Sequence, residues 1–160
     1  MVLRIGQRVP DFSLPDADAR ERKLSEFLTK SNVVLAFFPF AFSGVCDKEM
    51  CVFRDDMSKF AGIGSQVVGI SVDSVYTLKV FGQTYNLQLP LLSDFNRKVS
   101  KTYDALHDVW VNYGYKGVSK MAVFVIDKKG ILRYRWITNN PGEEPPYEEI
   151  QSALGKIAPQ

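Results

Sequence analysis

The sequence predicts an α/β protein in which helices flank a mixed central sheet. Three apolar runs, at 32–38, 66–72 and 121–127, lack polar alternation and so indicate strands buried on both faces. A helical pattern separates the first two runs, whereas a turn and a returning strand follow the third. A helix between strands favours parallel pairing with a right-handed crossover, and the turn favours an antiparallel hairpin.

The first half of the chain supplies the parallel part of this sheet. Residues 9–16 alternate apolar and polar side chains between prolines, which predicts a short edge strand because proline is tolerated at strand edges. Residues 24–28 predict a brief helical turn before the strand at 32–38. A helix is expected to start near Ser43 and to run to about Phe60, where glycines follow.

The second half of the chain completes the sheet and its helical cover. Its predicted elements are a helix at 75–85, a short strand or turn at 91–94, a helix at 96–103, the hairpin of 121–127 with 131–138, and a closing helix at 147–157. This order is that of a thioredoxin-like fold with an N-terminal extension. At this length we expect residues 1–160 to form a single domain.

Composition and charge exclude several functional classes. The 20 basic and 18 acidic residues are mixed along the chain and leave a net charge of +2, so no nucleic-acid partner is expected. No apolar run approaches the roughly 18 residues of a membrane span, and no signal peptide is expected. We therefore expect a cytoplasmic protein without a membrane partner. Two cysteines in a reducing compartment favour reactivity or metal binding over a structural cross-link.

The segment 39–51 carries the candidate chemistry. Cys46 follows the first buried strand and opens the predicted helix, and sites in open α/β sheets form beyond the carboxyl ends of strands. With Ser43 as N-cap, Cys46 would lie in the first turn, where the positive helix end favours an anion. Such a cysteine can have its pKa lowered from about 8.5 to roughly 3.5–7.5. The spacing alone fits a small buried apolar cysteine equally well.

Pro39, Ser43 and Cys46 match the pattern Pro-x-x-x-(Thr/Ser)-x-x-Cys. This pattern is the active-site signature of the peroxiredoxin family, which the chain therefore resembles. Further similar segments follow in the same order, at 9–12, 69–73, 92–94 and 124–127. The resemblance implies a thiol-dependent peroxidase, in which Cys46 is the peroxidatic cysteine that becomes a sulfenic acid. It implies that Ser43 hydrogen-bonds the peroxide and that Pro39 shields the sulfur. The substrates implied are hydrogen peroxide and organic hydroperoxides.

Cys51 stands five residues after Cys46, a spacing that resembles the atypical 2-Cys subgroup of peroxiredoxin Q and the bacterioferritin-comigratory protein. In that subgroup the second cysteine resolves the sulfenic acid as an intramolecular disulfide. Thioredoxin or a similar dithiol then reduces this disulfide to the two thiols. In an ideal helix the two Cα atoms would be roughly 8–9 Å apart, whereas a disulfide needs less than about 7 Å. The helix must therefore unwind. Alternatively, Cys51 is a core residue and an external thiol resolves Cys46.

One position departs from the family pattern. Peroxiredoxins usually carry an arginine three residues before the Phe of the third buried strand, and Met121 stands there. The candidate replacement cations are Arg133, Arg135, Arg54 and Lys120, and a site without a guanidinium is the remaining possibility. With two cysteines and one histidine, the chain lacks the four ligands of a structural zinc site, and we expect neither metal nor cofactor.

Two other functions fit the same fold. A thioredoxin-like disulfide oxidoreductase would need Cys-x-x-Cys at the helix start, and a non-catalytic redox sensor would tolerate Met121. Phe40 and Phe42 flank the reactive segment and fit either a dimer contact or the lining of the site, so a monomer and a homodimer both remain open. His107 is expected in a polar turn without a functional partner.

Overall fold

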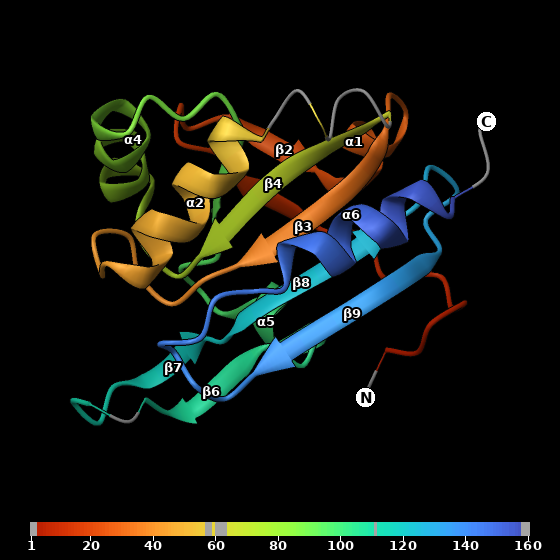
Figure 1. Cartoon of the computed structure of the whole chain (residues 1–160). Coiled ribbons are helices and arrows are strands. Elements are labelled where there is room, and N and C mark those ends of the chain that lie inside the picture. Colours follow the sequence, from red (N-terminus) through yellow and green to blue (C-terminus); the bar gives the residue numbers. More distant parts are fainter. Residues whose placement is uncertain (1–2, 57–58, 60–63, 111, 158–160) are drawn as a thin grey trace.

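A five-stranded mixed sheet forms the centre of the computed structural model, which describes residues 3–56, 59, 64–110 and 112–157. Its strand order is β5-β4-β3-β8-β9 (Figure 1). The strands are β3 (Asn32–Phe37), β4 (Ser65–Ser71), β5 (Leu91–Ser93), β8 (Met121–Ile126) and β9 (Leu132–Thr138). β3 pairs in parallel with β4, and β4 with β5, whereas β8 is antiparallel to both β3 and β9. The predicted mixed sheet is confirmed.

The central strands are mostly apolar because their side chains alternate between two cores. Val34, Val67 and Val125 are neighbours across the sheet and enter one core. The next row of neighbours enters the other core: Leu35, Val68 and Phe124. Every residue of β3 and β8 is buried. Because both faces of these strands are buried, their sequences do not alternate between apolar and polar residues.

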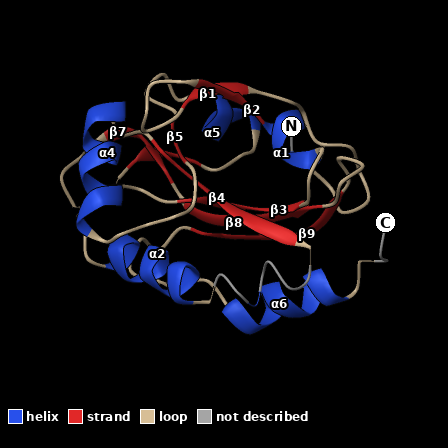
Figure 2. Cartoon of the chain, turned by 90° about the horizontal axis from the view of Figure 1, so that it is seen from above, coloured by secondary structure: helices blue, strands red, loops and turns tan. Residues whose placement is uncertain are grey.

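Helices cover both faces of the sheet (Figure 2). On one face lie α2 (Val45–Asp55), α4 (Val75–Thr84) and α6 (Tyr147–Gly155), which bury Met50, Leu78 and Ile150 among other side chains. On the opposite face lie the short helices α1 (Leu24–Leu28) and α5 (Lys98–Thr102). The cysteine segment thus belongs to the face covered by α2.

Two small antiparallel sheets complete the fold. One pairs β1 (Ser13–Pro15) with β2 (Glu21–Lys23), and the other pairs β6 (Leu106–Val109) with β7 (Lys116–Ser119). The strand expected at 9–16 is therefore shorter than predicted and pairs outside the central sheet, except for one isolated bridge from Asp16 to Leu92. His107 lies in β6 and is buried, so the expected polar turn is wrong.

Helix ends differ from the sequence prediction in a few places. The helix expected from 96 begins only at Lys98, because Arg97 adopts a left-handed backbone with φ of 65°. α2 ends at Asp55 among the described residues, and Phe60, the expected end, lies outside them. Within the described part of the chain, no helix is long and apolar enough to cross a bilayer.

Candidate active site

Cys46 is the second residue of α2, just beyond the carboxyl end of β3. The backbone reaches this position through a tight loop in which Phe42 and Gly44 have φ of 66° and 87°. Gly44 is the N-cap residue, and no side chain caps the helix. The expectation that Ser43 is the N-cap is therefore wrong. The left-handed turn moves the helix start one residue further, and the Ser43 hydroxyl instead donates to the Phe40 carbonyl at 2.7 Å.

The sulfur of Cys46 lies in the protein interior rather than at an open helix end. The residue is 1% exposed, and burial raises the pKa of its thiol to about 12. Hydrogen bonding by the Ser43 hydroxyl and the Phe40 backbone acts in the opposite direction but is the smaller effect. The lowered pKa expected from the helix start is wrong for this conformation, in which the thiol keeps its proton at neutral pH.

Met121 occupies the position expected to carry the family arginine, and its side chain contacts Cys46. The distance from Cys46 Sγ to Met121 Sδ is 4.0 Å, and Met121 is fully buried as the first residue of β8. A neutral thioether therefore stands where a guanidinium was expected. It offers the sulfur no positive charge that would lower its pKa.

The candidate replacement cations are engaged elsewhere. Arg133 Nε lies 2.7 Å from Asp127 Oδ2, and Arg135 donates to the Leu3 carbonyl. Arg54 pairs with Asp55 and donates to the Tyr85 carbonyl. Among the described residues, no hydrogen bond or ion pair of these arginines or of Lys120 reaches Cys46.

Strand geometry explains the orientation of Arg135. It is the register partner of Phe124, whose side chain enters the core on the face opposite α2. Met121 and Cys46 belong to the core beneath α2. Residues paired across neighbouring strands point to the same face of the sheet. Arg135 therefore points to the face of Phe124 and away from Cys46.

Glu49 is a candidate site residue that sequence reasoning missed. It lies one helical turn after Cys46 on the same face of α2, is fully buried, and neither carboxylate oxygen has a hydrogen-bond partner. Burial, together with the charge of Glu144, raises its pKa well above the usual range. Burial thus favours the protonated, uncharged form of the Glu49 carboxyl. The i, i+3 spacing from Cys46 is the sequence signal that could have identified it.

Cys51 is half-buried on the same helix, and both cysteines are free thiols. Contacts at both ends of α2 hold the helix against α4. The Tyr85 hydroxyl donates to Asp47 Oδ2 at 2.5 Å, and Arg54 Nη1 donates to the Tyr85 carbonyl at 2.6 Å. The two cysteines therefore stand in an intact helix that is fastened on either side of Cys51.

The aromatic residues of the loop pack within the chain. Phe40 makes an edge contact with Trp110 at 5.4 Å between ring centroids, and Phe42 makes one with Phe81 at 5.2 Å. Phe42 is nevertheless 46% exposed. Pro39, the remaining residue of the signature, is buried beside this loop.

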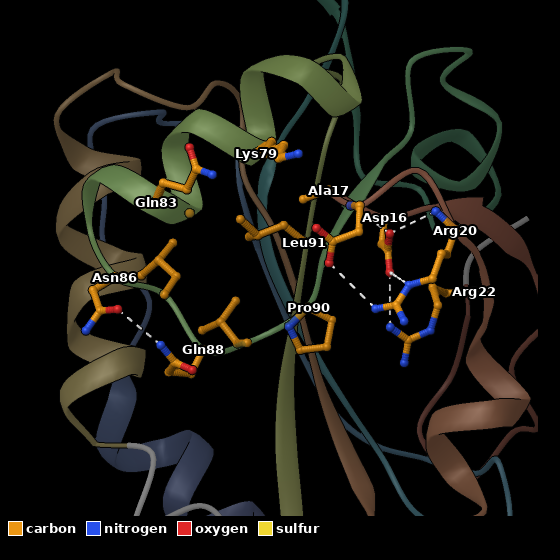
Figure 3. A pocket seen from close by; sticks show the side chains of 14 residues that line it. Asp16, Ala17, Arg20, Arg22, Lys79, Gln83, Asn86, Gln88, Pro90 and Leu91 are labelled. Atoms are coloured by element: carbon orange, nitrogen blue, oxygen red, sulfur yellow. Dashed lines mark hydrogen bonds and ion pairs between the residues drawn. The ribbon is translucent and has the colours of Figure 1, made fainter.

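A separate cavity of about 430 Å³ lies between the β1–β2 turn, α4 and β5 (Figure 3). Its central carboxylate, Asp16, is already satisfied by Arg22 and by the backbone N–H groups of Asp18 and Arg20. Neither cysteine lines it. In the described part of the chain, no three His, Cys, Asp or Glu side chains form a group that could hold a metal ion.

A mixed sheet with helices on both faces, carrying a cysteine at the start of the helix after its central strand, defines a cysteine-dependent oxidoreductase of thioredoxin-like fold. The chain belongs to the AhpC/TSA family, which matches residues 5–135.

Individual relatives agree with this family. The chain is 33% identical over 149 residues to the chloroplastic 2-cysteine peroxiredoxin of Chattonella marina var. antiqua, covering 87% of this chain and 73% of that protein. It is 36% identical over 135 residues to the chloroplastic peroxiredoxin Q of Triticum aestivum, covering 84% and 58%. The crystal structure of peroxidoxin BcpB from Mycobacterium tuberculosis superposes with a TM-score of 0.88 at 30% identity, covering 98% and 99%.

These similarities confirm the expected family, fold and enzyme class: the chain is a peroxiredoxin, a thiol-dependent peroxidase. Similarity to peroxiredoxin Q and to BcpB supports the Q and bacterioferritin-comigratory subgroup.

Proposed function

We propose that the chain reduces hydrogen peroxide and organic hydroperoxides with the sulfur of Cys46, and that Cys51 resolves the product as an intramolecular disulfide. The observation that carries the assignment is the place of Cys46, in the first turn of α2 and within reach of the Ser43 hydroxyl. Thioredoxin or a similar dithiol returns the electrons. Ser43 hydrogen-bonds the bound peroxide, and Pro39 keeps water from the sulfur.

The reaction proceeds in two balanced steps. The Cys46 thiol loses its proton, the thiolate attacks one peroxide oxygen and the O–O bond breaks; Cys46 becomes a sulfenic acid, and the departing hydroxide or alkoxide takes up the thiol proton and leaves as water or an alcohol. The Cys51 thiol then loses its proton, its thiolate attacks the Cys46 sulfur as the S–O bond breaks, and the departing hydroxide takes up that proton and leaves as water while the disulfide forms. A dithiol reduces this disulfide by exchange.

Because burial keeps Cys46 protonated in the closed conformation, we propose that the site opens before it reacts. Residues 40–44 and the first turn of α2 form the movable part, since Phe42, Ser43 and Gly44 are exposed and no side chain caps the helix. Opening admits peroxide and water, which reduces the desolvation that raises the pKa of Cys46.

Disulfide formation requires a larger change in α2. An intact helix keeps Cα atoms five residues apart at roughly 8–9 Å, beyond the reach of about 7 Å for a disulfide. We propose that α2 unwinds after oxidation and releases the contacts of Tyr85 with Asp47 and of Arg54 with the Tyr85 carbonyl. The site works without a positioning guanidinium, consistent with the engagement of Arg54, Arg133 and Arg135 elsewhere.

The wider assignment follows from this chemistry. A cycle that depends on regenerated thiols suits a reducing compartment, and we propose a cytoplasmic location. Residues 1–160 act as one domain, as a monomer or a homodimer, without nucleic acid or membrane as partner. The balanced net charge of +2 supports this.

Intact mass spectrometry after treatment with hydrogen peroxide tests the proposal. The wild-type chain should lose two hydrogens as the disulfide forms, and Cys51→Ser should instead gain the mass of oxygen, because Cys46 is oxidised and cannot form the disulfide. Cys46→Ser serves as the matched control and should remain unchanged. Recovery of unmodified Cys46 from the wild-type chain after exposure would refute the peroxidase assignment, whereas a sulfenic acid that persists beside an intact Cys51 would refute the resolving role.

A further inference from the structure

Two sulfur atoms meet in the interior of this protein. Cys46 Sγ and Met121 Sδ are 4.0 Å apart, with exposures of 1% and 0%. Met121 is held in register between β3 and β9, since Met121 pairs with Thr138 and its neighbour Ala122 pairs with Phe37. The thioether therefore sits on the rigid sheet and faces the reactive position from below α2.

We propose that Met121 is a second reductant for the oxidised site: when Cys51 does not resolve the Cys46 sulfenic acid, Met121 reduces it to the thiol and itself becomes methionine sulfoxide, whose oxygen comes from water. This inference rests on the proposed function, because it needs the sulfenic acid that peroxide generates. It assigns Met121 as an oxidation site that protects Cys46 from further oxidation. A guanidinium at the same position could not accept an oxygen atom.

The transfer balances in atoms and electrons. A lone pair of Met121 Sδ attacks Cys46 Sγ, the S–O bond breaks, and hydroxide takes up one proton and leaves as water. Water then adds to the positive Met121 sulfur, the S–S bond breaks, and its electron pair returns to Cys46. Of the two protons lost from the added water, one converts Cys46 to the thiol and one replaces the proton first consumed. Two electrons have moved from the methionine to the cysteine.

Glu49 is placed to supply the proton that the first step consumes. Its carboxyl lies one turn from Cys46, and neither of its oxygens has a hydrogen-bond partner. Burial favours the protonated carboxyl, which can donate to the leaving hydroxide and recover the proton afterwards. The same carboxyl can then donate a hydrogen bond to the new sulfoxide oxygen, which would otherwise be an unpaired polar atom in the core.

Met50 provides an internal reference for this chemistry. It is as buried as Met121 and belongs to the same core. Its sulfur lies against Gly69 of β4, and the sulfur–sulfur contact that Cys46 makes among the described residues is with Met121. Oxidant that penetrates the core without passing through Cys46 should therefore oxidise both methionines alike, whereas transfer from the sulfenic acid should oxidise Met121 alone.

The test uses full-length Cys51→Ser, exposed to a small excess of hydrogen peroxide without external thiol, followed by alkylation and peptide mapping. We expect sulfoxide on Met121, unmodified Met50, and a Cys46 that still reacts with the alkylating reagent. In Met121→Leu/Cys51→Ser the sulfenic acid should persist at least about tenfold longer, and further oxidation of Cys46 should follow. Glu49→Gln in the Cys51→Ser background should slow the transfer about tenfold or more, measured as the decay of the sulfenic acid once it has formed.

The remaining outcomes overturn the inference in distinguishable ways. Sulfoxide on Met121 at the same dose in Cys46→Ser/Cys51→Ser would mean direct oxidation. Sulfenic or sulfinic acid on Cys46 beside an intact Met121 would overturn the transfer while leaving the peroxidase function in place. A Cys46 that does not react with peroxide in any variant would refute the proposed function and the transfer together.

Discussion

Replacing Met121 with arginine should restore reactivity that burial suppresses. A cation within about 4–6 Å lowers the pKa of an acid by about 1–3, so the thiolate fraction at neutral pH should rise between about 10- and 1,000-fold. The structure favours the lower end of this range. Glu49 would ionise beside the new guanidinium, and a charged Glu49 raises the pKa of Cys46. We therefore expect an increase of about tenfold.

The assay is the rate of Cys46 alkylation by iodoacetamide at neutral pH, measured in the Cys51→Ser background. Met121→Leu is the matched control, because it keeps an apolar side chain of similar volume without charge. Placing a charged arginine at a fully buried position should cost several kcal/mol of stability, which thermal unfolding will show. Equal alkylation rates in folded Met121→Arg and folded Met121→Leu would refute the electrostatic reasoning.

Three further predictions concern the surroundings of the two cysteines. Tyr85→Phe removes the hydrogen bond to Asp47 and should speed disulfide formation several-fold in a stopped-flow fluorescence assay. Tyr76→Phe is the control, because Tyr76 is exposed on α4, and it should leave the rate unchanged. Equal rates in the wild type and both variants would exclude a role for the hydrogen bond. Ser43→Ala removes a hydrogen bond that lowers the pKa of Cys46 and should slow the reaction with peroxide about two- to tenfold. Glu49→Gln should raise the melting temperature at neutral pH by several degrees.

The sign of the Glu49 effect follows from its raised pKa. In the unfolded chain a glutamate loses its proton at about pH 4.3, whereas in the fold Glu49 keeps it to a higher pH. The unfolded state thus binds fewer protons above about pH 4.3, and wild-type stability falls as the pH rises through the window between the two pKa values. Glutamine removes this loss, so the two proteins should converge in acid. A stability difference that is the same in acid and at neutral pH would contradict this account.

The sheet could be predicted from the sequence because its signal is local. β8 and all of β3 after Asn32 are apolar runs without polar alternation, which is the pattern of a strand buried on both faces. The β6–β7 pair left no such trace, since its strands are short and largely polar. The left-handed backbone at Phe42 could not be predicted from the sequence either. For this reason the N-cap was predicted at Ser43, whereas it is Gly44.

The candidate site was predicted in its residues but not in its electrostatics. Cys46 and Met121 were identified from the motif and from the position three residues before Phe124. The charge state of Cys46 depends on burial, which no sequence spacing specifies, and the helix start suggested a lowered pKa where the interior raises it. Glu49 was missed for the same reason, because a glutamate in a helix is ordinarily exposed.

The contact between Cys46 and Met121 joins α2, which we propose unwinds after oxidation, to β8, which is paired on both sides. In the proposed cycle, Cys46 leaves the Met121 methyl group when α2 unwinds and returns to it when the disulfide is reduced. The NMR resonance of that methyl group should therefore take one chemical shift in the wound, reduced protein and another in the disulfide form. The protein thus carries its own indicator of progress through the cycle, which needs no attached label.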